Sequence, residues 1–298
     1  MPQAMIIINP SSGKEEALEY VRFAERVLKD KGYTVTIKET GKELDATRYS
    51  TAACEECFDL VVSIGGDGTL HETINGLIDQ DHHPRLGVVP LGTANDFARA
   101  LQIPLNPEIA IQTLASSNVK TVDIGSLNDQ LFGNVVAIGS LAGSLSTVTS
   151  EDKTRLGILA YLKEGLKQLT STSAHPLVIQ YDGNTWQGES PLFLAVLTNS
   201  VGGFENLNPD ATVDDGLLHC FILKDLSLFN TITAGISLLL GNLKNHKDVI
   251  YFTATNVSVS SSEVVNSNVD GEEGPNLPIR LSVLPSHIEV IVPEVLPN

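Results

Sequence analysis

One local pattern repeats through the first 125 residues of the chain. A short apolar run ends in a polar or glycine-rich loop, and a stretch with helical periodicity follows. The apolar runs are AMIII at 4–8, DLVVSI at 59–64 and RLGVVP at 85–90. Strands that are apolar along their whole length are typical of a parallel sheet buried on both faces. The pattern therefore predicts an α/β domain built on a parallel sheet.

The stretches between these runs predict the remaining elements of the domain. Residues 17–28 carry alanine, valine and leucine on one helical face, and residues 33–40 alternate like a strand. A further helix is expected over residues 45–56. Another is expected to begin near Thr69, with one apolar side made of Leu70, Ile74, Leu77 and Ile78.

The loop GGDGT follows the second apolar run and carries three glycines around one aspartate. Gly65, Gly66 and Gly68 let the backbone approach a ligand closely, and the following helix start favours anions, so the loop predicts a phosphate cradle. The carboxylate of Asp67 would repel a phosphate unless a magnesium ion lay between them. The alternative is that Asp67 caps the helix.

The loop PLGTAND follows the third apolar run and has a similar character. It places Thr93, Asn95 and Asp96 at an expected helix start, which is also typical of plain helix capping. Loops that follow parallel strands lie at the same edge of a sheet, where ligands bind. We therefore expect NPSSGK, GGDGT and PLGTAND to gather along that edge.

After about residue 125 the pattern changes to short strands separated by turns. The strands are expected in QLFGNVVAIG, LVIQYDG, NTWQGE, LFLAVLTNS, LLHCFIL, ATNVSVSS, IRLSVL and HIEVIV. Asp182-Gly183 is typical of a hairpin turn, and two helices are expected near 155–169 and 225–241. We predict an α/β nucleotide-binding domain over 1–125 and a mainly antiparallel β-sandwich-like domain over 126–298. The last 10 or so residues return to the first domain, and the active site lies in the inter-domain cleft.

Charge and apolar content limit the partners. The net charge of −17 disfavours nucleic acid, whose phosphates would be repelled. The start MPQAMIIINP has no basic residue, and the longest apolar stretch, around 232–241, falls short of a spanning helix. We expect a soluble cytoplasmic protein.

Cys54 and Cys57 form a C-x-x-C motif, which redox chemistry or half a zinc site could explain. No second such motif exists, and the pair lies in an expected helix. We therefore expect that these two cysteines and Cys220 are reduced structural thiols.

GGDGTLHE followed by PLGTANDFAR resembles the diacylglycerol kinase catalytic-domain family of lipid kinases, in particular its bacterial members. NPSSG resembles the family's first nucleotide loop, NPDATVDDGLL (208–218) its metal-bearing loop, and the segment 269–293 its closing segment. NAD kinases and phosphofructokinases share a GGDG-type loop, so the PLGTAND loop and the late Asp-Gly-Glu carry the specificity.

The resemblance implies a set of ATP-contacting residues in these loops. They are Asn9, Pro10, Ser11, Ser12, Gly13, Thr40, Gly65, Gly66, Asp67, Gly68, Thr69, Leu70, His71, Glu72, Thr93 and Asn95.

The resemblance also implies the catalytic and metal residues. Asp270, in VDGE, takes the family's general-base position, Glu272 orients the base or magnesium-bound water, and Asp67 organises the magnesium. Asp215, with the backbone oxygens of Thr212 and Leu217, takes the position of a structural Mg²⁺ site. Taken without the family, VDGE and TVDDGLL could each be an ordinary turn.

The expected activity is an ATP- and Mg²⁺-dependent lipid kinase that converts diacylglycerol into phosphatidic acid. The expected partners are ATP and a diacylglycerol-like membrane lipid, met through transient peripheral contact at the inner membrane surface, with a homodimer left open. The basic amphipathic segment 151–169 is the candidate docking helix, or else a helix packed on the second domain. The alternatives are a kinase acting on another glycerolipid, a sphingoid base or NAD, of which PLGTANDFAR disfavours NAD, and a catalytically silent regulator that binds nucleotide or lipid.

Overall fold

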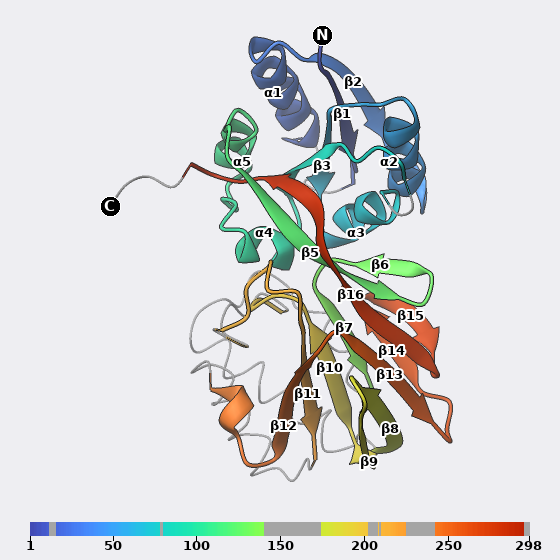
Figure 1. Ribbon diagram of the computed structural model, residues 1–298. Helices are drawn as coiled ribbons and strands as arrows, with labels where there is room; N and C mark the ends of the chain where they lie inside the picture. The colour runs from blue at the N-terminus through green and yellow to red at the C-terminus, as the bar shows by residue number, and fades with distance from the viewer. Residues whose placement is uncertain are drawn as a thin grey trace. The chain divides into compact units, whose positions relative to one another are not determined.

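The structure is a computed structural model that describes residues 1–11, 16–77, 80–139, 174–201, 208, 210–224 and 242–294 (Figure 1). The chain forms two compact units. The first unit comprises Met1–Ile124 with Pro285–Asn298, and the second comprises Gly125–Leu284. The predicted helices near 155–169 and 225–241 and the candidate docking segment lie outside the described residues.

The first unit is built on a parallel sheet in the order β2-β1-β3-β4. Its strands are β1 Gln3–Ile8, β2 Thr34–Glu39, β3 Leu60–Gly65 and β4 Arg85–Pro90. The carboxyl-terminal part of β16, Ile279–Ile291, adds to β4 in parallel. Strands β1, β3 and β4 are almost fully buried, as expected of strands that are apolar along their length.

Helices cover both faces of this sheet. They are α1 Glu16–Asp30, α2 Asp45–Glu55, α3 Asp67–Asn75, α4 Asp96–Ala100 and α5 Pro107–Thr113. Helix α1 packs beside α5 and α2 beside α3, on opposite sides of the sheet in Figure 1. The apolar faces predicted for α1 and α3 are buried where described, and the α/β fold of this unit is confirmed.

Helix α3 begins at Asp67, two residues before the expected start near Thr69. Gly66 is extended, with φ −88° and ψ −173°, and the chain turns into the helix directly after it. Gly68 was interpreted as part of the loop, but it lies in the first helical turn. Asp67 is therefore the first helical residue rather than a loop residue.

The second unit is an antiparallel β-sandwich. One sheet has the order β12-β11-β10-β7-β14-β15, and the other includes the amino-terminal part of β16 with β13, β8 and β9. The strands are β5 Val119–Leu127, which begins in the first unit, β6 Gln130–Phe132, β7 Val135–Ile138, β8 His175–Tyr181, β9 Asn184–Ser190, β10 Leu192–Val196, β11 Leu218–Leu223, β12 Val249–Ala254, β13 Asn256–Ser261, β14 Asn266–Val269 and β15 Glu272–Asn276. A single 3₁₀ turn is described in this unit, Leu243–Asn245.

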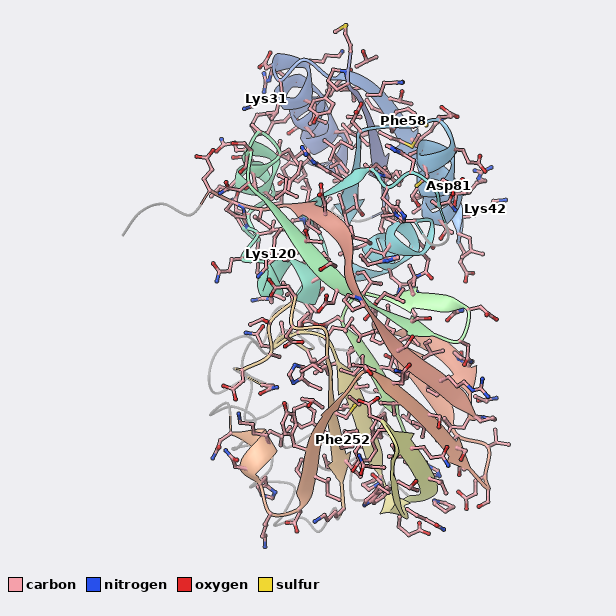
Figure 2. The ribbon with its side chains drawn as sticks, in the orientation of Figure 1. Lys31, Lys42, Phe58, Asp81, Lys120 and Phe252 are labelled. Atoms are coloured by element: carbon pink, nitrogen blue, oxygen red, sulfur yellow. The ribbon has the colours of Figure 1, made fainter. Side chains whose placement is uncertain are left out.

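Both sheets contribute side chains to one buried cluster, which confirms the sandwich. Phe193 and Cys220 come from one sheet, and Ile179 and Val257 from the other. Phe252 of β12, labelled in Figure 2, stacks on Tyr181 of β8 with ring centroids 3.8 Å apart. The Asp182-Gly183 hairpin is confirmed, since both residues have positive φ as a type I′ turn requires.

The predicted strands IRLSVL and HIEVIV are one strand, β16, instead of two. Pro285 lies between the two predicted strands, and a proline cannot donate a hydrogen bond to a sheet. The chain instead kinks at Ser286, which has φ +52°, and continues. The carboxylate of Asp123 accepts the Ser286 N–H at 2.8 Å and supports this kink.

In the part of the chain that the structure describes, no helix has the length and apolarity needed to cross a membrane.

The three cysteines are free, and Cys54 and Cys220 are buried whereas Cys57 is exposed. Cys54 lies in α2, and Cys57 follows the helix in a left-handed conformation. Burial raises the pKa of the Cys54 thiol to about 11 and raises that of Cys220 as well. Both side chains therefore stay neutral and poorly nucleophilic near neutral pH.

We expect a thiol reagent applied to the native protein at about pH 8 to modify Cys57 and to spare Cys54 and Cys220. All three thiols should react after unfolding in denaturant. Mass spectrometry of the labelled peptides checks the assignment. Rapid labelling of native Cys54 would contradict its burial and would reopen a redox role for the C-x-x-C motif.

Candidate active site

The predicted loops meet along the carboxyl edge of the parallel sheet. The register pairs Ile8 with both Glu39 and Ile64, and Gly65 with Pro90, so the four strands end side by side. The loops after β1, β2 and β4 each begin with one further hydrogen bond between neighbouring strands. The Asn9 N–H donates to Ile64 O at 3.1 Å, Thr40 N–H to Ile8 O at 2.9 Å and Leu91 N–H to Gly65 O at 2.7 Å. The expected gathering of these loops is confirmed.

The loop after β1 is shaped by Asn9. Its Oδ1 lies 3.0 Å from the amide nitrogen of Ser11 and 2.6 Å from the hydroxyl of Ser11, and accepts from both. Pro10 lies between them and is half-buried, while Ser12 and Gly13 lie outside the described residues. Asn9 thus closes a short polar turn over residues 9–11.

The loop after β2 is held by Asp45. Its carboxylate accepts the N–H groups of Gly41 at 2.9 Å and Lys42 at 3.2 Å and pairs with Arg48. The Gly41 hydrogen bond is the main reason that the pKa of Asp45 lies below its ordinary value. Thr40, at the start of this loop, turns its hydroxyl toward Ile8 O at 3.3 Å.

Two glycines bring the GGDGT and PLGTAND loops into backbone contact. A Cβ on Gly92 would lie 2.7 Å from the Cα of Gly66, and a Cβ on Gly66 would lie 3.2 Å from the Cα of Gly92. At Gly65 a Cβ would meet Thr69, with 2.6 Å to its hydroxyl oxygen. Gly65, Gly66 and Gly92 are therefore needed for the packing of the protein itself, apart from any ligand.

Asp67 joins the two loops through its side chain. The carboxylate accepts the N–H of Asn95 at 2.8 Å and the N–H of Asp96 at 3.2 Å. These amides open helix α4, so Asp67 caps α4 from the first turn of helix α3. Its own helix has no side-chain cap. Asp67 is therefore a capping residue, as the alternative interpretation held, but it caps α4 and not its own helix, α3.

Asn95 completes the closure of the PLGTAND loop. It adopts the left-handed conformation, and its side chain bridges the loop by accepting from Gly92 N at 3.0 Å and donating to Gly92 O at 2.8 Å. Arg99 donates to Ala94 O at 2.7 Å. Asn95 is buried, while Thr93 at the tip is exposed. The loop is thus preformed and presents Thr93.

The remaining predicted residues of α3 differ in what they contact. Leu70 is 7% exposed, and its N–H donates within the helix to Gly66 O, so its side chain belongs to the core. The carboxylate of Glu72 accepts the Ala46 N–H at 3.1 Å and thereby supports the start of α2. His71 accepts, through its carbonyl oxygen, from the side chain of Asn75 at 2.9 Å. Gly68 and Thr69 stay at the positive end of α3.

Asp270 lies in the second unit, at a turn between β14 and β15. Asp270 and Gly271 both have positive φ, 51° and 97°, as in a two-residue hairpin turn. The Asp270 carboxylate accepts three backbone N–H groups, from Gly133 at 2.7 Å, Asn134 at 3.0 Å and Val135 at 2.8 Å. Glu272 is exposed. VDGE is thus a turn, and it also holds a carboxylate in a fixed orientation.

The loop 212–217 folds around Asp215. Its two carboxylate oxygens accept the N–H groups of Thr212 and Leu217, each at 3.0 Å, and Oδ2 also contacts His219 Nε2 at 2.9 Å. A carboxylate offers about four acceptor positions, so one remains beside these three contacts. A carboxylate oxygen together with main-chain carbonyls would be an oxygen-only donor set, the kind that suits Mg²⁺. Within the described ranges, no group of three or more His, Cys, Asp or Glu side chains could hold a metal.

Sequence reasoning missed His219, because no histidine pair had metal-ligand spacing. His219 lies in the apolar strand β11 and is 3% exposed. A histidine within such a strand was the available signal, since a buried imidazole needs polar partners. The amides of residues 133–135 were missed as well, because a backbone donor carries no sequence signal.

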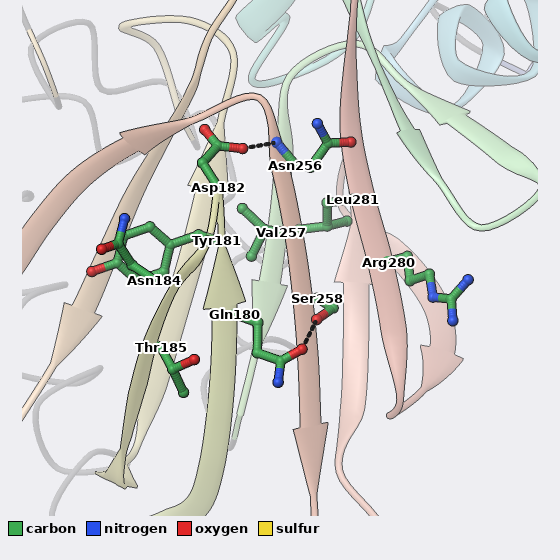
Figure 3. Close-up of a pocket in the computed structure, with 11 residues that line it drawn as sticks. Gln180, Tyr181, Asp182, Asn184, Thr185, Asn256, Val257, Ser258, Arg280 and Leu281 are labelled. Carbon is green, nitrogen blue, oxygen red and sulfur yellow. Dashed lines mark hydrogen bonds between the residues drawn. The ribbon is translucent and has the colours of Figure 1, made fainter.

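A pocket of ≈ 410 Å³ lies elsewhere, on the second unit. It is lined by residues of β8, β9, β13 and β16, among them Gln180, Ser258 and Arg280 (Figure 3). Figure 3 shows Ser258 donating to Gln180 across the two strands, at 3.4 Å. None of the predicted site residues lines this pocket.

Comparisons with known proteins agree along the whole chain. Residues 3–127 match the family model of the diacylglycerol kinase catalytic domain, and residues 134–292 match that of the YegS C-terminal NAD kinase beta sandwich-like domain. A diacylglycerol kinase of Bacillus subtilis (strain 168) is 40% identical over 99% of this chain and 97% of its own length.

Solved structures show the same fold. The crystal structure of a diacylglycerol kinase from Bacillus anthracis str. Sterne is 25% identical, with a TM-score of 0.76 and coverage of 97% of this chain and 96% of that one. A second structure from the same organism is 26% identical, with a TM-score of 0.84 and coverage of 99% and 98%.

Proposed function

Because the chain belongs to the diacylglycerol kinase catalytic-domain family and is therefore a lipid kinase, we propose that its acceptor is the free hydroxyl of diacylglycerol. The products are phosphatidic acid and ADP. The acceptor is inferred from the relatives, which are named diacylglycerol kinases. The observation that supports phosphoryl transfer from a nucleotide is the preformed edge of the first unit, where Gly66 and Gly92 let two loops meet beside the start of α3. Such an arrangement of backbone amides at a helix start suits the phosphates of a nucleotide.

ATP is proposed to bind along this edge. Asn9 and Thr40 begin two of the four loops, and Gly66, Gly68 and Thr69 surround the start of α3. The fixed amides would stabilise the phosphate charge without reorganising during the reaction. Leu70 can contribute only through its backbone, because its side chain belongs to the core. Asp67 holds α4 in place on this edge and is also proposed to organise the magnesium ion.

Asp270 is proposed as the general base. A bond forms between the lipid hydroxyl oxygen and the γ-phosphorus as the bond from that phosphorus to the β-phosphate oxygen breaks. The hydroxyl proton passes to the Asp270 carboxylate. The amides of residues 133–135 hold that carboxylate in a fixed orientation. Glu272, two residues further on, is proposed to orient the base.

Magnesium is proposed as the accompanying ion, with Asp215 and the carbonyl oxygens of Thr212 and Leu217 as its protein ligands. The fixed Asp215 carboxylate supports the assignment, because Mg²⁺ prefers oxygen ligands. When bound, the ion would neutralise negative charge in the surrounding acidic loop. The lipid resides in a membrane and ATP in the cytoplasm, so we also propose transient peripheral contact with the inner membrane surface.

The test is phosphorylation of a lipid panel in mixed micelles with radiolabelled ATP and MgCl₂. The panel contains diacylglycerol, monoacylglycerol, a sphingoid base and ceramide, with NAD as a water-soluble control. We expect phosphatidic acid as the main product on thin-layer chromatography. A different phosphorylated lipid would correct the acceptor. Nucleotide binding without turnover on any acceptor would refute the kinase and support a regulatory protein.

A further inference from the structure

A chain of polar contacts runs inward from Asp215 into the second unit. His219 Nε2 lies 2.9 Å from Asp215 Oδ2, and His219 Nδ1 lies 2.7 Å from the hydroxyl of Tyr251 and 2.8 Å from the side-chain nitrogen of Asn208. Asn208 is 0% exposed and His219 is 3% exposed. Leu218 and Cys220, the neighbours of His219 in β11, are also buried, so water has little access to the ring, whereas the Asp215 side chain is 20% exposed.

The partners determine which nitrogen of His219 carries the proton. An ionised carboxylate can only accept, so Nε2 is the nitrogen that donates to Asp215, and Nδ1 is left as an acceptor. Asn208 presents its NH₂ group to Nδ1, although its Oδ1 then has no hydrogen-bond partner among the described residues. A reversed amide would place two acceptors face to face. Both ring nitrogens are therefore hydrogen-bonded, and these hydrogen bonds fix the orientation of the ring.

The fixed ring supplies the third hydrogen bond to the Asp215 carboxylate. Thr212 and Leu217 donate through backbone amides of the same loop, which can move together with Asp215. His219 is different because it belongs to β11, which pairs with β10 and β12 on both sides. It is the contact that ties the carboxylate to the rigid sheet.

We propose that His219 is a positioning residue, which orients the Asp215 carboxylate for a divalent cation at the loop 212–217. Tyr251 and Asn208 hold the ring in the tautomer that this task requires. The inference rests on the metal site of the proposed function. Partners of a metal ligand typically change metal affinity by about 10- to 100-fold when they are removed.

The experiment measures Mn²⁺ binding to the nucleotide-free protein by electron paramagnetic resonance, with Mg²⁺ as competitor. We expect His219→Leu to weaken Mn²⁺ binding by about 10- to 100-fold. His219→Gln should stay close to the wild type, because its amide can donate to Asp215. Cys220→Ala is the matched control: it alters the next buried residue of β11, whose side chain belongs to the core cluster, and should leave Mn²⁺ affinity unchanged.

Thermal unfolding without metal separates a lost fold from a lost contact. If His219→Leu does not fold, Tyr251→Phe replaces it as the test. This variant removes one hydroxyl that meets Nδ1, and it should weaken Mn²⁺ binding while Cys220→Ala does not.

Each outcome decides between the proposals. Unchanged Mn²⁺ affinity in folded His219→Leu, with loss in Asp215→Asn, would overturn the positioning role alone. Unchanged affinity in Asp215→Asn would overturn both the positioning role and the proposed metal loop. Binding that depends on Asp215 and His219 would support the inference even if the lipid panel refuted the kinase.

Discussion

Asp270→Asn is expected to lower the rate of lipid phosphorylation by about 10²- to 10⁴-fold, because an amide cannot take the hydroxyl proton. Asparagine is the suitable replacement, since residue 270 has φ +51° and asparagine tolerates the left-handed conformation. The KM for ATP should stay near the wild-type value, because the proposed nucleotide loops belong to the other compact unit. The micelle assay, run at saturating ATP, measures the loss.

The same substitution should also lower stability by a predictable amount. The side-chain NH₂ group of asparagine would face at least one of the backbone N–H donors from Gly133, Asn134 and Val135. A buried donor left without an acceptor costs about 1–3 kcal/mol in the free energy of unfolding. Denaturant titration measures this loss in the free energy of unfolding separately from activity. The kinetics can then be recorded under conditions in which the variant is folded.

Glu273→Gln is the matched control for Asp270→Asn. Glu273 is an exposed residue of the adjoining strand β15, and it loses the same single charge on substitution. Its activity should equal that of the wild type. If folded Asp270→Asn turned over as fast as Glu273→Gln, Asp270 would not be the base, and its three amide contacts would serve the hairpin alone.

The strands of the first unit could be predicted because their burial is local information. AMIII and RLGVVP are apolar along their length, since both faces of each strand are covered. Strands β14, NSNV, and β15, EEGPN, carry no such pattern. They are strands because β14 pairs with β7, about 130 residues earlier in the chain. Local sequence cannot express that pairing.

Helix α5 was missed although its signal was local. Asn106 accepts the Ile109 N–H at 3.0 Å as a cap, and Pro107 is the first helical residue. This pair is a recognised helix start. The helix has only seven residues, which are too few to show a clear helical periodicity. Its capping residues would have had to be considered before periodicity to predict it.

The candidate site could likewise be predicted from the sequence only in part. The glycine loops could be located from the sequence, because glycine marks a close backbone approach. The groups that these loops contact could not be predicted, because Gly66 meets Gly92 and Asp67 meets Asn95 only after the sheet aligns the two loops. The partners of Asp270 lie about 136 residues earlier. A sequence pattern thus identifies the polar side chains, whereas the fold determines which of them face one another.

Gly92→Ala is expected to disable the nucleotide site while leaving the proposed base, Asp270, in place. The new Cβ would lie 2.7 Å from the Cα of Gly66 and 2.8 Å from Asn95 Oδ1. A backbone atom cannot rotate away as a side chain can, so the two loops must separate. Overpacking of this kind costs about 1–3 kcal/mol in stability. A displacement near 1 Å in a catalytic site can cost about 100-fold in rate, and we expect a loss of that order in kcat/KM for ATP.

Gly41→Ala provides the control at the same edge of the sheet. The nearest atom to its Cβ would be Asp45 Oδ2 at 3.8 Å, an ordinary contact, and Gly41 does not adopt positive φ. Its stability should lie within about 0.5 kcal/mol of the wild type, with ATP kinetics unchanged. Equal ATP kinetics in Gly92→Ala and Gly41→Ala would show that the nucleotide does not need the close approach of Gly66 and Gly92. A loss confined to Gly92→Ala would trace ATP binding to that contact, because both variants add the same methyl group at the same edge.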